Sequence, residues 1–133
     1  MNEKHEFLGN YFGGKSFSEL LSMVKSENPK DVLTLIEGVE EMIKKNNNIT
    51  YTQTRNILKE VKKEEFKADL SKFYMVLPKL AYIEARLDKD RGKSVVTFIR
   101  GLAANVTKEP ATSYENFEEI MNTIVAYLKL YGK

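Results

Sequence analysis

Hydrophobic residues recur every three or four positions along most of this chain, which places them on one face of an α-helix. The pattern is clearest after Asn28 and Pro29, which fit the N-cap and first turn of a helix that ends before Asn46. Its apolar face comprises Val32, Leu35, Ile36, Val39, Met42 and Ile43. The alternation typical of a half-buried strand is hard to find, so the sequence predicts helix almost throughout.

Polar residues mark the starts of two further helices. Ser16 is a candidate N-cap for a short helix that begins at Phe17. Thr50 and Gln53 form a capping box, in which each side chain accepts a hydrogen bond from the backbone amide of the other residue. We therefore expect a helix over residues 51–63, and we expect Gln53 to cap it rather than to contact a ligand.

Two longer stretches complete the pattern. Hydrophobic spacing over residues 66–87 predicts one helix, and Pro78 within it predicts a kink or a restart because proline lacks an amide hydrogen. A helix over residues 95–106 follows, and Thr112 with Glu115 forms a second capping box that is predicted to begin the last helix. The expected fold class is all-α, a compact bundle of about five or six helices.

A length of 133 residues suits one domain. We expect a single helical domain over residues 1–133, with N-terminal helices over 1–48 and a core over 49–133. No apolar run approaches the roughly 20 residues that span a bilayer, and the first residues carry no secretory signal. We therefore expect a cytoplasmic protein without a membrane partner.

Composition narrows the chemistry further. The chain has no cysteine, and His5 is its one histidine, which excludes disulfides, thiolate metal sites and thiol nucleophiles and leaves most catalytic triads and zinc sites without a partner. No acid–base pair stands out in an apolar setting. We therefore expect no catalytic residue, no metal ion and no cofactor, and we expect that the protein is not an enzyme.

One motif in the sequence is typical of nucleotide-binding proteins. Residues Gly9–Ser16 match G-x-x-x-x-G-K-S, the pattern of a phosphate-binding loop. Such a loop needs a buried strand before it, and the eight residues before Gly9 are mostly polar and too few for a central strand. We interpret the motif as a glycine turn that precedes the first helix.

Charge is distributed unevenly along the chain, although the net charge is only +2. Residues 49–108 hold 13 basic and seven acidic residues, a net +6, whereas the segments before and after each carry a net −2. A basic patch of this kind can meet nucleic acid, an anionic membrane or an acidic protein, or it can be an ordinary solvated surface.

Spacing arranges some of these cations in lines. Arg55, Lys59 and Lys62 fall at i, i+4 and i+7, and Lys72, Lys79 and Arg86 are each seven residues apart. A straight helix would hold the second set over about 21 Å, a spacing that could follow RNA phosphates without reading bases. Solvent-facing lysines of ordinary amphipathic helices give the same pattern. Tyr51, Tyr74, Tyr82, Tyr114 and Tyr127 are candidates for stacking on bases, although the spacing of Tyr74 and Tyr127 favours the core.

Three segments resemble one protein family. Residues 49–58, I-T-Y-T-Q-T-R-N-I-L, resemble the L-T-x-S/T-Q-L/I-R motif of the small helical subunit of type III-A CRISPR effector complexes, the Csm complex. Residues 77–86, L-P-K-L-A-Y-I-E-A-R, are similar to its L-x-P-K-L-A-Y-x-x-G-R segment, and residues 117–129 to its closing F-x-x-F/L-x-x-x-V-A-Y-H-K. The chain departs from these motifs at Thr54, Ala85 and Leu128.

The resemblance implies a non-catalytic CRISPR-Cas subunit that stacks in several copies along the guide RNA–target RNA duplex. The implied partners are both RNAs, the other subunits of the complex and further copies of the chain, and the free chain could be a dimer. Cutting of the target would belong to other subunits. The charge pattern and the resemblance together give the candidate RNA-binding residues Arg55, Lys59, Lys62, Lys79, Arg86 and Arg91.

A second hypothesis stays open at this point. The chain could be a helical protein–protein adaptor whose basic face binds an acidic partner. That function would place Arg55 and Arg86 in salt bridges with protein carboxylates, whereas RNA binding would be salt-sensitive and independent of sequence.

Overall fold

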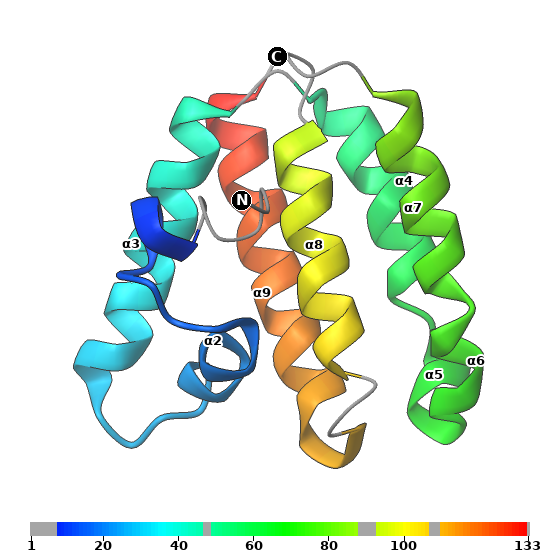
Figure 1. Cartoon of the computed structure of the whole chain (residues 1–133), viewed down its shortest axis with the longest axis horizontal. Helices are drawn as coiled ribbons and strands as arrows, with labels where there is room; N and C mark the ends of the chain where they lie inside the picture. The colour runs from blue at the N-terminus through cyan, green and yellow to red at the C-terminus, as the bar shows by residue number, and fades with distance from the viewer. Residues whose placement is uncertain (1–7, 47–48, 88–92, 107–109, 133) are drawn as a thin grey trace.

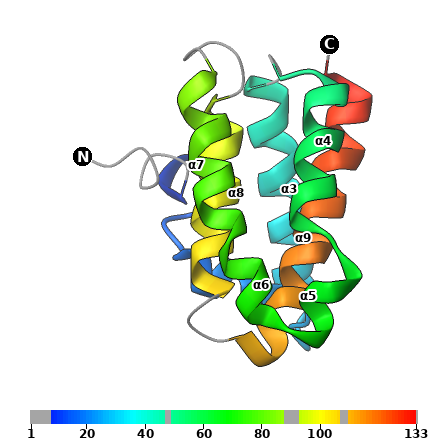
Figure 2. The same ribbon diagram turned by 90° about the vertical axis from the view of Figure 1, so that its right-hand side faces the viewer.

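The computed structural model describes residues 8–46, 49–87, 93–106 and 110–132, which are mainly helical and include no strand. The long helix α9 lies at the centre, with α3, α4 and α8 packed around it, and α7 packs on the outer side of α8 (Figures 1 and 2). The prediction of an all-α, compact bundle is confirmed. The helices are α2 (Phe17–Met23), α3 (Pro29–Lys45), α4 (Tyr51–Val61), α5 (Glu64–Ala68), α6 (Leu70–Tyr74), α7 (Val76–Arg86), α8 (Lys93–Val106) and α9 (Pro110–Tyr131).

The predicted N-caps of α2, α3 and α4 are confirmed. The Thr50 hydroxyl accepts from the Gln53 amide at 3.0 Å, and the Gln53 side-chain oxygen accepts from the Thr50 amide at 2.9 Å. Asn28 caps α3 by accepting from the Lys30 amide at 3.0 Å. Ser16 caps α2 and forms with Glu19 a further capping box, whose hydrogen bonds lower the pKa of the Glu19 carboxyl. Polar side chains thus fix where these three helices begin.

Two aromatic clusters fill the core. Phe12 stacks on Phe98 of α8 with ring centroids 5.2 Å apart, and Phe17 of α2 packs on the same ring at 5.7 Å. At the other end of the bundle, edge-to-face contacts join four rings from three helices. This second cluster comprises Phe66 of α5, Phe73 of α6, and Tyr114 and Phe117 of α9.

The single helix predicted over residues 66–87 is instead three helices. Asp69 adopts extended backbone and its carboxylate accepts from the Ser71 amide at 3.1 Å, so it caps α6 rather than continuing α5. The next break falls at Met75, and Pro78 is the third residue of α7. Proline is tolerated there because first-turn amides have no intrahelical acceptor. The predicted restart of the helix near Pro78 is confirmed, although it lies just before the proline. The break at Asp69 was not predicted.

The predicted start of the last helix is wrong. Helix α9 begins at Pro110, so Thr112 lies inside the helix and does not cap it. Proline at the first helical position loses no hydrogen bond, which favours this earlier start. Glu115, the other half of the predicted box, forms an ion pair with Lys25 at 3.0 Å instead.

The glycine motif at residues 9–16 has no phosphate-loop geometry. Residues 8–11 are helical, and the chain then turns through Gly13 and Gly14, whose φ angles of 63° and 80° favour glycine. Ser16, which would hold a metal ion in a phosphate loop, accepts from the Glu19 amide. The expected glycine turn is present, but it lies between two helical segments and not before the first one.

Candidate nucleic-acid interface

Helix α4 presents Arg55 and Lys59 to solvent, because Thr54, Ile57 and Val61 take up its buried face. The Arg55 guanidinium lies over the Tyr51 ring, 5.9 Å from its centroid. Within the described part of the chain, neither Arg55 nor Lys59 has a carboxylate partner. These two charges are therefore available for an anionic ligand.

Lys62 does not continue this line. It is the C-cap of α4, with extended backbone at φ −120° and ψ 92°, and its ammonium donates to the Asn122 side-chain oxygen of α9 at 3.3 Å. Lys129, also on α9, lies 6.0 Å from the Tyr51 ring on which Arg55 packs. Lys129 was not a candidate in the sequence. Tertiary packing of α9 against α4 therefore places Arg55, Lys62 and Lys129 along the same helix–helix boundary.

Helix α7 carries Lys79 and Arg86 on the side that faces α4. The Lys79 ammonium forms an ion pair with Glu60 of α4 at 3.3 Å. Arg86 donates to the Tyr82 hydroxyl at 3.5 Å, and its guanidinium lies 5.6 Å from the centre of the same ring. Lys72 lies on α6 and pairs with Glu65 at 3.9 Å, so the predicted three-residue line is interrupted by the break at Met75.

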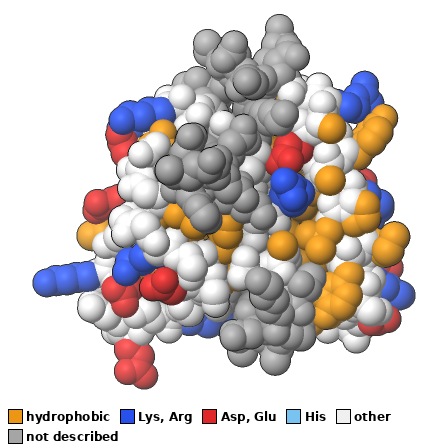
Figure 3. All heavy atoms as spheres, viewed as in Figure 1, with side chains coloured by type: hydrophobic (Ala, Val, Ile, Leu, Met, Phe, Trp, Pro, Cys, Tyr) orange, Lys and Arg blue, Asp and Glu red, His pale blue; other side chains and the backbone are white. Residues whose placement is uncertain are grey.

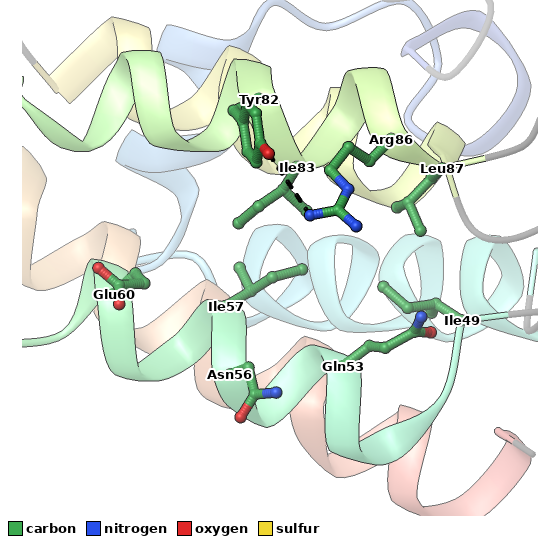
Figure 4. A pocket seen from close by; sticks show the side chains of 9 residues that line it. All are labelled: Ile49, Gln53, Asn56, Ile57, Glu60, Tyr82, Ile83, Arg86 and Leu87. Carbon is green, nitrogen blue, oxygen red and sulfur yellow. Dashed lines mark hydrogen bonds between the residues drawn. The ribbon is translucent and has the colours of Figure 1, made fainter.

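An open groove separates α4 from α7. Its volume is about 500 Å³, and it continues into a second hollow of about 450 Å³ that also includes Pro78 and Lys79. Figure 4 shows Arg86 and Ile83 on α7 across this space from Gln53 and Ile57 on α4. The lining residues are Ile49, Gln53, Asn56, Ile57, Glu60, Tyr82, Ile83, Arg86 and Leu87.

The structure thus divides the predicted RNA-binding residues between two neighbouring surfaces. Arg55 and Lys62 lie at the α4–α9 boundary, and Lys79 and Arg86 lie at the α4–α7 groove. Lys59 is exposed on α4, and Arg91 falls outside the residues that the structure describes. Figure 3 shows hydrophobic side chains gathered with cations on the side of the molecule that carries α7.

The tyrosine candidates differ sharply in exposure. Tyr82 is 63% exposed and Tyr74 is 38% exposed, so the expectation that Tyr74 belongs to the core is wrong. Tyr114 is buried, and burial together with the nearby Glu118 carboxylate raises its pKa to about 12. The Tyr131 hydroxyl donates to Glu40 at 2.7 Å, which raises the pKa of Tyr131. Tyr82 is therefore the most accessible of these rings.

Glu84 is a half-buried acidic side chain on α7. Its carboxylate pairs with Arg100 of α8 at 2.9 Å and so links α7 to α8. Among the described residues, no three acidic or histidine side chains are placed to share a metal ion. No helix in the described part of the chain has the length and hydrophobicity of a membrane span.

Comparison with known proteins gives one match. The family model for Csm2 Type III-A matches residues 26–133. The chain belongs to this family. No curated protein and no solved structure matches the chain.

The Csm2 Type III-A family is a family of structural subunits. The chain is therefore a small subunit of the multi-subunit type III-A CRISPR effector complex. The resemblance noted in the sequence is confirmed and extended, because the match begins at Ser26 and includes α3. It leaves out the glycine motif at residues 9–16 and helix α2. All six candidate RNA-binding residues lie inside the matched region.

Proposed function

We propose that this Csm2-family subunit binds RNA through its phosphate backbone, along the α4–α9 boundary and the rims of the α4–α7 groove. The candidate contacts are Arg55, Lys59, Lys62, Lys79, Arg86 and Arg91. In this function the subunit is non-catalytic, acts in the cytoplasm and holds the guide RNA–target RNA duplex within the effector complex.

One observation carries the proposal. Arg55 and Arg86 are exposed, and each lies over a tyrosine ring rather than in an ion pair with a carboxylate of the described residues. A guanidinium in this setting keeps most of its N–H donors for a phosphate, which it can bind in a bidentate manner. The adaptor hypothesis would instead pair these guanidinium groups with carboxylates of a partner protein.

The test compares charge-removing variants by fluorescence anisotropy with a labelled RNA over a range of salt concentrations. If each arginine contacts one phosphate, Arg55→Gln and Arg86→Gln each lower the slope of log affinity against log salt by about 0.7–0.9. Lys30→Gln is the matched control, because Lys30 is an exposed cation on α3 with no ion pair among the described residues. The adaptor function predicts no salt-sensitive binding of RNA by any of these proteins.

Avidity requires a second form of this test. Repeated copies on one RNA gain affinity from effective concentration, so an isolated chain binds more weakly than a row of copies. The same variants are therefore assembled with the other subunits and guide RNA, and target binding is measured on the intact complex. Full assembly and unchanged target affinity with Arg55→Glu and Arg86→Glu combined would contradict the proposed contacts.

Self-association in several copies is part of the proposal. Two exposed apolar side chains belong to separate parts of the bundle, Leu33 to α3 and Met75 to the junction of α6 and α7. Figure 1 shows α3 on one side of the bundle and α6 and α7 on the other. Such side chains mark contacts with other proteins when they gather with further apolar surface. Sedimentation velocity over a range of concentrations tests whether Leu33→Glu or Met75→Glu weakens association relative to the parent chain.

A further inference from the structure

The groove between α4 and α7 has a chemical character that phosphate binding does not explain. Its floor is apolar, since the buried Ile49 and Ile57 meet the half-buried Ile83 and Leu87 there. Glu60 lies in the wall shared by both parts of the groove. A phosphate is repelled by a carboxylate and gains nothing from an apolar floor, so phosphates belong on the rims and not inside.

An aromatic ring forms part of the wall. Tyr82 is 63% exposed, far more than packing within the bundle requires, and it lines both parts of the groove. The Arg86 guanidinium lies 5.6 Å from the ring centre, so a flat cation and a flat ring are already placed together. Exposed tyrosine and arginine planes are the surfaces on which unstacked RNA bases stack.

Hydrogen-bond donors reach into the groove from both helices. The Gln53 side-chain oxygen is occupied by the Thr50 amide, so its amide group is left to donate. Among the described residues, the Arg86 guanidinium donates only to the Tyr82 hydroxyl, at the long distance of 3.5 Å. Figure 4 shows the Arg86 guanidinium over the groove close to Ile83, and the Gln53 side chain beside Ile49, where α4 begins. The site therefore suits a flat, uncharged ligand whose edge carries acceptors.

We propose that the α4–α7 groove receives one unstacked nucleobase of the bound RNA, with Tyr82 as its stacking partner and Arg86 and Gln53 as donors to its edge. This inference rests on the proposed RNA binding and extends it from phosphates to a base. Lys79 lies at the second hollow and Arg86 lines the groove, so Lys79 and the Arg86 N–H donors that do not meet the base would hold the backbone beside the inserted nucleotide.

The experiment separates bases from phosphates. Two RNAs of the same length are compared, a single-stranded oligouridine and a ribose-phosphate chain that lacks every base. The expected result is that the parent chain binds the oligouridine about 5- to 150-fold more tightly than the abasic chain. The Tyr82→Ala variant is expected to bind both RNAs with the affinity that the parent chain has for the abasic RNA. Its slope of log affinity against log salt is expected to equal that of the parent.

Two variants serve as controls. Tyr74→Ala removes a tyrosine that is also exposed but lies on α6, outside the groove, and it keeps the preference for bases. Tyr82→Phe keeps the ring and also keeps the preference. Because the Tyr82 side chain is largely exposed, its removal leaves the fold intact, which far-ultraviolet circular dichroism verifies.

The outcomes distinguish the base site from the phosphate contacts. If Tyr82→Ala lowers the affinity for both RNAs equally, the base site is wrong and the phosphate contacts stand. The same holds if the parent chain binds both RNAs with equal affinity and that affinity depends on salt. A failure of Tyr82→Ala to join the effector complex, with RNA binding intact, assigns the groove to a neighbouring protein and also overturns the base site. Absence of binding to either RNA, alone and in the complex, contradicts both proposals.

Discussion

Removing one hydroxyl group from Tyr114 tests how α4 is held against α9. The Tyr114 hydroxyl donates to the Val61 carbonyl at 3.1 Å, and Val61 is the last residue of α4. Carbonyls in the last turn of a helix have no intrahelical donor, so Tyr114 satisfies one of them from another helix. Tyr114→Phe keeps the ring contacts with Phe66, Phe73 and Phe117 and deletes the hydrogen bond to Val61.

The cost at neutral pH follows from burial. Val61 is fully buried and Tyr114 is only 3% exposed, so water does not replace the lost donor. A buried carbonyl without a partner costs about 1–3 kcal/mol, and we expect Tyr114→Phe to lower the free energy of unfolding by that amount. The end of α4 that follows Arg55 and Lys59 would then be held less firmly.

Alkaline pH reduces the difference in stability between the two proteins. Burial, with added repulsion from Glu118, raises the pKa of Tyr114 to about 12, against about 10 in an unfolded chain. A folded pKa above the unfolded one gives stability that is complete below pH 10 and is lost as the pH rises toward 12. The pKa shift corresponds to roughly 3 kcal/mol of the free energy of unfolding. Tyr114→Phe has no hydroxyl that can titrate at this position, so its stability does not fall for this reason.

The assay is urea unfolding followed by circular dichroism at intervals between pH 8 and pH 11.5. The parent chain should be more stable than Tyr114→Phe at pH 8, and the difference should shrink steadily above pH 10. Tyr74→Phe controls for the titration of an exposed tyrosine and should differ from the parent by less than about 0.5 kcal/mol throughout. A difference between the parent and Tyr114→Phe that stays constant across this pH range would refute the reasoning.

Three further changes have definite expected results. Gly38→Ala should lower the free energy of unfolding in urea by about 1–3 kcal/mol, because the added Cβ would lie 2.5 Å from the Phe12 ring. Thr50→Ala should cost about 1 kcal/mol through the lost cap of α4, measured in the same way. Glu60→Gln removes the carboxylate partner of Lys79, and anisotropy should show tighter RNA binding with a salt slope steeper by about 0.7–0.9.

Much of the helical framework could be predicted because its signals are local. A capping box involves residues three apart, so Thr50 and Gln53 place the start of α4 without knowledge of any other helix. The same local rule failed at Thr112, where Pro110 offered an earlier start and Glu115 found a partner 90 residues away in sequence. Local patterns compete, and tertiary contacts decide between them.

The grouping of the cations could not be predicted from spacing. Arg55 and Lys62 align on an ideal helix, but Lys62 caps α4 and turns to Asn122 of α9. Lys79 and Arg86 do share a face of α7, yet what they face is set by the packing of α4 beside it. Lys129 joins the site through packing alone, from a stretch that the sequence placed in the final helix without a role.

The open groove follows from the way its two walls are supported. Helix α4 is held to α9 by the Tyr114 hydrogen bond and by Lys62, whereas α7 packs on α8 and is linked to it by the Glu84–Arg100 ion pair. Each wall therefore has its main partner on the side away from the groove, and the two walls meet each other at the apolar floor and through the Lys79–Glu60 ion pair. A groove built in this way keeps its width without a ligand, because closing it would break contacts on both outer sides. For the proposed nucleobase site this means that binding costs little rearrangement of the protein, and that Tyr82→Ala should change affinity without changing stability.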